Sequence, residues 1–283
     1  MSKIGFIGYG HMGSVLLNSL ISSGAMPSGD VVISTRTKGK LAQLRSEYPD
    51  VEVVDSSDEV AMRCRRIFIM TGTLDVAGVI KEIHGHIDEK THLIYISGGL
   101  EIKSVENVFG GKVTRLLPTL LSEVYEGYTL VCHNDRVDDN DMHFIDRLLE
   151  KIGQVKSIDE RLFEVGGCLT SCAPAFIASI LKHLSVCAVC SSSFSYEDAY
   201  ELTLRTVLGT AELLVKTNED FDQMVGRVAT KGGATEQGVK VLEQRLPEIF
   251  RELLEKTLIP HRTRNETTRK QFIELKADMD DQA

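Results

Sequence analysis

The amino-acid sequence predicts an α/β protein: a doubly wound, mostly parallel sheet followed by an all-helical half. In the first half, short apolar runs alternate with helical segments, which is typical of a parallel sheet covered by helices on both faces. After about residue 158, apolar residues recur at helical spacing and no convincing strand follows. The chain of 283 residues is long enough for two domains, which we expect at 1–158 and 159–283.

The individual elements follow from these patterns. Strands are predicted at 3–7, 31–34, 51–54, 67–70, 92–96, 112–117, 128–132 and, at an edge, 155–158. Helices are predicted among them at 14–23, 38–47, 57–64 and 144–152. The second half is expected to form helices at 161–189, 196–216, 219–227, 235–244 and 247–272. Pro247 stands where a first-turn proline is tolerated, which favours a separate last helix.

The first predicted strand runs directly into a glycine-spaced turn, Gly8-Tyr9-Gly10-His11-Met12-Gly13. Strand, turn and helix in this order form the dinucleotide-binding fingerprint of a Rossmann-type fold. The first glycine permits the tight turn, the second lets a pyrophosphate approach the backbone, and the third lets the helix pack on the strand. We therefore expect all six residues at a cofactor. A turn that serves packing alone is the alternative.

The end of the second predicted strand indicates which dinucleotide binds. NAD-binding folds usually carry an acid there to hold the ribose hydroxyls, but this segment reads Ser34-Thr35-Arg36-Thr37-Lys38. Because hydroxyls and cations suit a 2′-phosphate, we expect NADP (as NADPH) to be favoured over NAD. The expected contacts are Ser34, Arg36, Thr37 and Lys38. In the alternative interpretation, Arg36 and Lys38 merely begin a surface helix.

Composition excludes several classes of partner. A formal net charge of −9 argues against nucleic acid, whose binding needs a basic surface. The one basic cluster, His261 to Lys270, is expected at the solvated end of the last helix. We see no apolar stretch of membrane-spanning length, and residue 1 leads straight into the first strand, leaving no room for a signal peptide. A cytoplasmic protein without a membrane partner is expected.

The six cysteines do not predict a metal site. Cys187 and Cys190 have the spacing of a redox or zinc pair, and His183 shares their helical face. However, they belong to an apolar helical run, where thiols act as small core residues, and no second ligand pair follows. We expect no metal.

The helical half carries more apolar surface than its own helices can bury. Segments 177–184 and 202–214 are apolar over wide arcs, and such helices need cover on several sides. A second copy of the chain would supply that cover, so we expect a homodimer, with a larger assembly left open. A self-contained helical core is the alternative.

A second glycine loop, Thr230-Lys231-Gly232-Gly233-Ala234-Thr235, precedes a predicted helix. Two glycines at a helix start, with hydroxyls on either side, make a nest of backbone amides suited to a carboxylate. A plain turn between helices explains the same residues equally well.

Over roughly residues 3–258, the order of motifs resembles the pyrroline-5-carboxylate reductase family. The opening 4–12 is similar to that family's start, and Ser97-Gly98-Gly99-Leu100 to its small-residue loop near the nicotinamide. Segments 169–176 and 206–211 are similar to its Gly-Ser-Gly-Pro-Ala-Tyr helix start and its dimer helix. The loop 232–235 is similar to its substrate loop.

The resemblance implies an NADPH-dependent reductase of a cyclic imino acid, making proline in the family's usual case. It also implies interlocked dimers, with each active site between a nucleotide domain and helices of the partner. Thr235 would be the catalytic contact to the substrate ring nitrogen. The substrate would be held by Thr230, Lys231, Gly232, Gly233 and Ala234, and the cofactor would also meet Met70, Thr71, Gly72, Ser97 and Gly98.

Several motifs depart from the family pattern. Thr71-Gly72-Thr73 replaces a Lys-Pro, Leu117 to Leu121 replaces Met-Pro-Asn-Thr-Pro, and Lys231 stands where a proline is usual. A related cyclic imine as substrate is therefore one alternative, and a non-catalytic NADP-binding regulator is another. A 3-hydroxyacid dehydrogenase would need a lysine early in the helix after the boundary, and 174–181 contains none.

Overall fold

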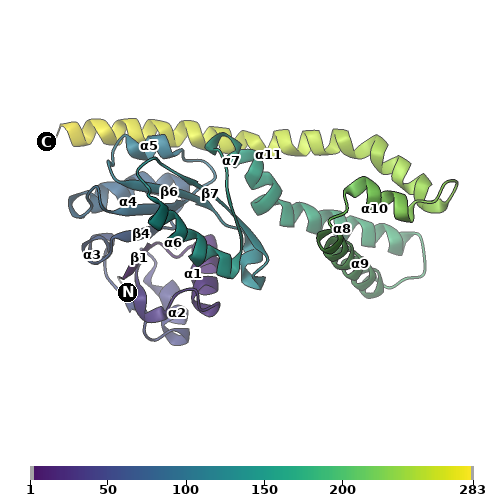
Figure 1. The fold of residues 1–283 in the computed structure, drawn as a ribbon, viewed down its shortest axis with the longest axis horizontal. Helices are drawn as coiled ribbons and strands as arrows, with labels where there is room; N and C mark the ends of the chain where they lie inside the picture. The colour runs from purple at the N-terminus through teal and green to yellow at the C-terminus, as the bar shows by residue number, and fades with distance from the viewer. Residues whose placement is uncertain (1–2, 282–283) are drawn as a thin grey trace. The chain divides into compact units, whose positions relative to one another are not determined.

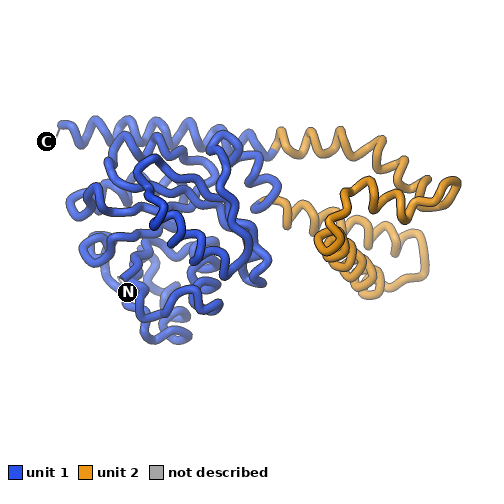
Figure 2. The backbone as a smooth tube through the Cα atoms, viewed as in Figure 1, with its two compact units in different colours: residues 1–171, 257–283 blue, residues 172–256 orange. Residues whose placement is uncertain are grey.

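The computed structural model describes residues 3–281 and divides the chain into two compact units. Residues 1–171 and 257–283 form the first unit, and residues 172–256 form the second (Figure 2). This division differs from the one expected at residue 158. The reason is that the end of the last helix packs against the first unit, where Phe272 and Leu275 join the core.

The first unit contains an eight-stranded sheet with the order β3-β2-β1-β4-β5-β6-β7-β8 (Figure 1). All pairings are parallel except that of β6 with β7. The strands are β1 (Ile4–Ile7), β2 (Val31–Ser34), β3 (Glu52–Val53), β4 (Arg66–Ile69), β5 (His92–Ile96), β6 (Lys112–Leu117), β7 (Gly127–His133) and β8 (Gly153–Ser157). The predicted fold class and its eight strands are confirmed.

Seven α-helices accompany the sheet in the first unit, besides the end of the last helix. They are α1 (His11–Ser22), α2 (Leu41–Glu47), α3 (Ser57–Arg63), α4 (Val76–Ile83), α5 (Ile102–Glu106), α6 (Asp139–Leu149) and α7 (Phe163–Gly167). Sequence analysis missed α4 and α5. These helices have eight and five residues, and helices this short are stabilised chiefly by tertiary packing, which a local sequence pattern does not show.

Both faces of the sheet are buried, which explains the continuous apolar runs in its central strands. One core cluster includes Ile67 and Ile69 of β4 with apolar residues of α3 to α5. The other includes Phe6 and Phe68, whose rings stack with centroids 4.9 Å apart, with residues of α1, α2 and α6. The parallel strands therefore present their carboxyl ends at one edge, where ligands bind in open α/β sheets.

The second unit is helical. It contains α8 (Ala173–Cys190), α9 (Tyr196–Thr217), α10 (Phe221–Val228) and the first part of α11 (Ala234–Asp280). The prediction of separate helices at 235–244 and 247–272 is wrong, because α11 is one helix of 47 residues (Figure 1). Pro247 lies inside it, where the ring removes one backbone hydrogen bond without ending the helix.

The apolar surface of this unit is largely exposed. Ile177, Ile180 and Leu184 of α8 and Leu202 and Leu208 of α9 are each 48–59% exposed. The expectation that no stretch reaches membrane-spanning length is wrong: by length and composition, the helical segment Glu160–Cys190 contains an apolar window long enough to cross a membrane. Only 6% of that window is buried, so this segment needs a covering partner of some kind.

Candidate cofactor and substrate site

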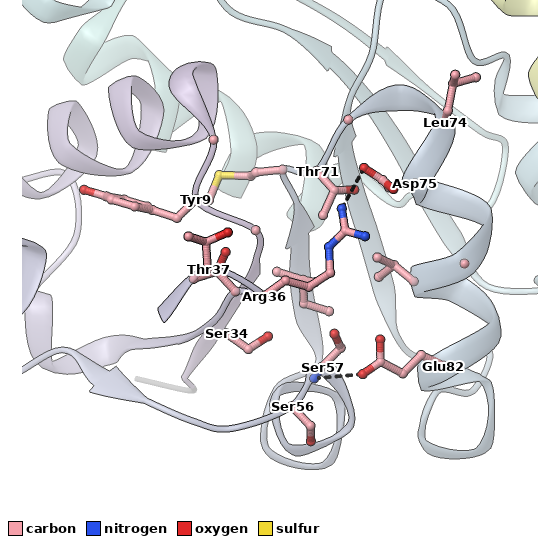
Figure 3. A pocket seen from close by; sticks show the side chains of 18 of the residues that line it. Tyr9, Ser34, Arg36, Thr37, Ser56, Ser57, Thr71, Leu74, Asp75 and Glu82 are labelled. Carbon is pink, nitrogen blue, oxygen red and sulfur yellow. Dashed lines mark hydrogen bonds and ion pairs between the residues drawn. The ribbon is translucent and has the colours of Figure 1, made fainter. Parts of the chain in front are cut away.

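A cleft of about 560 Å³ lies at the carboxyl ends of β1, β2 and β4 (Figure 3). It is formed within the first unit. Of the predicted cofactor residues, it is lined by Gly8, Tyr9, Gly10, Ser34, Arg36, Thr37, Met70, Thr71 and Gly72. The remaining predicted cofactor residues do not line it: His11, Met12, Gly13, Lys38, Ser97 and Gly98. The structure therefore brings together three sequence segments that carry the dinucleotide interpretation.

The three glycines of the first turn differ in their steric surroundings. A Cβ atom on Gly8, whose φ is +98°, would lie 2.9 Å from the Met70 carbonyl, and one on Gly13 would lie 2.9 Å from Met70 Cβ. At Gly10 the nearest atom to an added Cβ is 3.9 Å away. Gly8 and Gly13 are thus required by packing, whereas Gly10 leaves its backbone open to a ligand in the cleft.

Arg36 extends across the cleft from the loop after β2. Its guanidinium lies 3.0 Å from the Asp75 carboxylate, which belongs to the short turn η3 (Thr73–Asp75) after β4 (Figure 3). Lys38 instead forms an ion pair with Asp55, and this contact lowers the pKa of the Asp55 carboxyl. Arg36 is therefore the predicted cation that reaches the cleft, while Lys38 lies outside it.

The cleft also holds buried polar atoms that have no hydrogen-bond partner among residues 3–281. These atoms are the hydroxyl oxygens of Ser34 and Thr71 and the side-chain oxygen of Gln271. Buried polar groups normally find a partner, so such atoms mark hydrogen-bonding capacity for a ligand. Together with the open backbone at Gly10 and the cation of Arg36, they fit a phosphorylated dinucleotide.

The loop Ser97–Leu100 follows β5 and is held from several sides. The Ser97 hydroxyl accepts a hydrogen bond from the Gly99 amide (3.0 Å) and lies 3.1 Å from the Thr73 hydroxyl. The Tyr95 hydroxyl donates to the Leu100 carbonyl at 3.0 Å, and complete burial raises the pKa of this phenol. These contacts tie the loop to β5 and to η3.

Arg115 of β6 places a buried charge beneath this loop, which sequence analysis did not single out. Its Nε donates to the Ser97 carbonyl (3.0 Å), and its Nη1 donates to Glu160 (2.8 Å). The same Glu160 oxygen accepts the Ile102 amide at 2.8 Å. The guanidinium also lies over the Phe163 ring, 4.5 Å from its centroid. Burying a charge is costly unless it is paired and hydrogen-bonded. The Nε and Nη1 atoms of Arg115 meet that condition, whereas Nη2 is buried without a hydrogen-bond partner among the described residues.

The second glycine loop lies in the other unit, between α10 and α11. Gly232 has a φ of +77°, and a Cβ on Gly233 would lie 2.7 Å from the Thr230 hydroxyl oxygen, so both glycines are conformationally required. The Gly232 amide donates to the carboxylate of Glu236 (2.9 Å), which lowers the pKa of that carboxyl. The loop already binds one carboxylate, supplied by the chain itself.

Two family models match the chain in succession. The model described as an NADP oxidoreductase, coenzyme F420-dependent, matches residues 3–98, and the pyrroline-5-carboxylate reductase dimerisation model matches residues 160–263. A relative from Bacillus subtilis, pyrroline-5-carboxylate reductase 3, is 32% identical over 272 residues, covering 96% of this chain and 100% of its own. The chain belongs to the pyrroline-5-carboxylate reductase family. The resemblance stated from sequence motifs is confirmed.

Solved structures agree with this assignment. A pyrroline-5-carboxylate reductase from Coxiella burnetii has a TM-score of 0.80 at 26% identity, covering 97% of this chain and 98% of its own. A Plasmodium falciparum pyrroline carboxylate reductase solved with NADP has a TM-score of 0.78 at 22% identity, covering 96% and 98%. The second of these shows a shared fold.

Family membership explains the exposed apolar helices. The dimerisation model covers residues 160–263, which include most of the apolar segment Glu160–Cys190 and all of α9. A helix that is apolar over a wide arc gains stability when a second copy covers it. The match to a dimerisation model indicates that the exposed faces of α8 and α9 contact another copy of the chain in a dimer or a larger oligomer.

Proposed function

We propose that this protein reduces the C=N bond of pyrroline-5-carboxylate with NADPH, giving proline. The observation that carries this proposal is the 32% identity to a reductase of the same name over that relative's full length. The cleft supports it, because its glycine turn and its buried polar atoms suit a dinucleotide. The match of residues 3–98 to an NADP oxidoreductase model supports the same cofactor.

The preference for NADPH over NADH rests on the end of β2. The loop there contributes Ser34, Arg36 and Thr37 to the cleft and carries no carboxylate that would hold ribose hydroxyls. A guanidinium pairs with phosphate oxygens through two parallel hydrogen bonds. Arg36 would therefore hold the 2′-phosphate, with Ser34 and Thr37 beside it.

The substrate is assigned to the loop 230–235. The first turn of α11 attracts a carboxylate, and Lys231 adds a positive charge beside it. In the structure the Gly232 amide donates to Glu236 and the Gly233 amide donates to the Thr230 carbonyl, so a substrate carboxylate would compete with these acceptors. Thr230 and the amides around Gly233 and Ala234 would hold the substrate carboxylate, and the Thr235 hydroxyl would hydrogen-bond the ring nitrogen.

The reaction asks little of the protein beyond positioning. When bound, NADPH supplies a hydride to the C=N carbon, and the ring nitrogen ends with a proton and a single bond. A protonated imine is already electrophilic, so holding it in the correct orientation supplies most of the rate enhancement. Thr235 would orient the nitrogen, and the loop amides would orient the carboxylate.

We propose a homodimer formed through the helical unit, in the cytoplasm. The dimerisation model over residues 160–263 and the exposed apolar faces of α8 and α9 support the dimer. The full-length match to a bacterial reductase supports the proposed compartment.

A non-catalytic NADP-binding regulator is the second candidate. It is favoured by the changed motifs near the expected nicotinamide, where Thr71-Gly72-Thr73 replaces a Lys-Pro and Thr119 replaces the family's asparagine. The decisive experiment follows NADPH absorbance with pyrroline-5-carboxylate and a panel of cyclic imines. Turnover of pyrroline-5-carboxylate supports the proposed reductase. Turnover of another imine alone means that the substrate assignment is wrong while the reaction type holds. Tight NADPH binding without turnover of any imine supports the regulator.

A further inference from the structure

The last part of α11 belongs to the nucleotide-binding unit of its own chain. Residues 257–280 pack on this unit through Thr268, Phe272 and Leu275, each at most 5% exposed. Near the end of the helix, Asp278 pairs with Lys81 of α4 at 2.7 Å. Neither family model extends past residue 263. The basic cluster itself is solvated as expected, because Arg262, Arg264, Arg269 and Lys270 are exposed and only His261 is half-buried; another face of the same helix is buried.

This buried face lies against the loop Ser97–Leu100. A Cβ on Gly98 would lie 3.0 Å from the His261 ring, and one on Gly99 would lie 2.8 Å from Arg264 Cβ. The Thr268 hydroxyl is 3.0 Å from the Gly99 carbonyl. The Thr268 hydroxyl is also within hydrogen-bond distance of the Arg264 and Asn265 carbonyls of its own helix. Those carbonyls already accept backbone amides of the helix, so the Gly99 carbonyl is the acceptor for which the Thr268 hydroxyl matters most.

Gln271, one turn beyond Thr268, lines the dinucleotide cleft. Its side-chain nitrogen donates to the Leu74 carbonyl at 3.3 Å. This contact directs the NH₂ group at Leu74 and leaves the amide oxygen as the second polar atom. That oxygen, Oε1, is buried and has no hydrogen-bond partner among the described residues.

Gln271 Oε1 is therefore a hydrogen-bond acceptor, so the ligand group that it contacts must be a hydrogen-bond donor. Phosphate oxygens of a dinucleotide only accept hydrogen bonds, whereas ribose hydroxyls donate them. Gln271 contacts Leu74, and Thr268 on the preceding turn of the same helix contacts Gly99 of the loop Ser97–Leu100, which is expected near the nicotinamide. We propose that Gln271 is a cofactor-binding residue that accepts a hydrogen bond from a hydroxyl of the ribose next to the nicotinamide. This inference rests on the proposed function, because it takes NADPH as the ligand.

The test compares Gln271→Met, which keeps the length of the side chain but removes its polar atoms, with Lys270→Met, an exposed neighbour on the same helix. Dissociation constants are measured for NADPH and for adenosine 2′,5′-bisphosphate, which contains only the adenosine half. We expect Gln271→Met to raise the Kd of NADPH about tenfold and to leave the Kd of the adenosine fragment unchanged. Lys270→Met should change neither constant.

Each result has a defined meaning. Unchanged NADPH binding in Gln271→Met overturns the inference, and so does an equal loss for NADPH and the fragment, which would indicate a general disturbance of the cleft. A thermal melting curve of each apoprotein separates loss of folding from loss of a contact. If the unsubstituted protein binds no NADPH, the proposed function fails and the inference fails with it; if it binds NADPH and turns over, only the variant decides.

Discussion

The guanidinium of Arg36 lies 3.0 Å from the carboxylate of Asp75 across the dinucleotide cleft (Figure 3). The pair joins the loop after β2 to the turn after β4, so it crosses the space between two strand ends that a nucleotide would occupy. Both side chains are substantially exposed, at 82% and 44%, and such pairs contribute at most about 1 kcal/mol. A 2′-phosphate can therefore replace Asp75 as the partner of Arg36 at little cost.

This relationship predicts opposite effects for two variants. Arg36→Ala should raise the Kd of NADPH by about ten- to a hundredfold, because a charge-assisted contact is lost. The Kd of NADH should stay nearly unchanged. Asp75→Asn should lower the Kd of NADPH by up to about fivefold, because Arg36 loses the carboxylate that competes with the 2′-phosphate. Titration of both cofactors against both variants checks this. Equal losses for NADPH and NADH in Arg36→Ala would remove Arg36 from the phosphate site.

The glycine turn gives a second, internally matched pair of variants. Gly10→Ala has room within the protein and a φ of −80° that alanine accepts, but its methyl group would occupy the cleft. Gly13→Ala would press on Met70 Cβ at 2.9 Å and force α1 to shift.

We expect Gly10→Ala to keep its melting temperature and to lose at least tenfold in NADPH affinity. Gly13→Ala should lower the free energy of unfolding by about 1–3 kcal/mol, as overpacked positions do. Denaturant unfolding and NADPH titration of each variant measure the two effects. A Gly10→Ala protein that binds NADPH normally would show that the backbone there does not approach the cofactor.

How far the sequence predicted this molecule depends on the distance between partners along the chain. The turn 8–13 and the loop 34–37 were predicted because local patterns specify them. The cleft residues Asp75 and Gln271 were missed, since each acts through a partner far away in sequence. Arg115 was read only as part of a strand, and nothing local links it to Glu160, 45 residues later.

Pro247 illustrates a different limit. As a local signal it favours the start of a helix, and that was the prediction. In the structure α11 continues through this position, and its far end packs into the nucleotide-binding unit. Tertiary packing of Phe272 and Leu275 stabilises a helix that continues past Pro247. This stabilisation outweighs the cost of one missing backbone hydrogen bond.

The proposed role of Thr235 separates turnover from cofactor binding. Thr235 lies in the first turn of α11, in the second unit, and the dinucleotide cleft is formed within the first. Thr235→Ala should therefore lower kcat with pyrroline-5-carboxylate by about ten- to a hundredfold, with the Kd of NADPH nearly unchanged. Thr235→Ser, which keeps the hydroxyl, should restore most of the rate. An unchanged kcat in Thr235→Ala would exclude this residue from the mechanism.

Buried His92 and its half-buried neighbour His133 predict sensitivity to acid. The Thr114 hydroxyl lies 2.6 Å from His92 Nε2 and 2.8 Å from His133 Nδ1. The pKa of His92 is lowered to about 4, chiefly by burial; Asp141 opposes this shift, and His133, Arg66 and Lys112 contribute to it. Burial also lowers the pKa of His133.

Because the folded protein binds fewer protons than the unfolded chain between about pH 6.5 and 4, the free energy of unfolding should fall as the pH falls through this range. For His92 alone the loss from pH 7 to pH 5 should be about 2 kcal/mol. His92→Gln keeps a polar side chain next to Thr114 but does not titrate, so its unfolding free energy should depend less on pH. Urea unfolding of both proteins at the two pH values measures the difference, and parallel losses would show that other groups control acid stability.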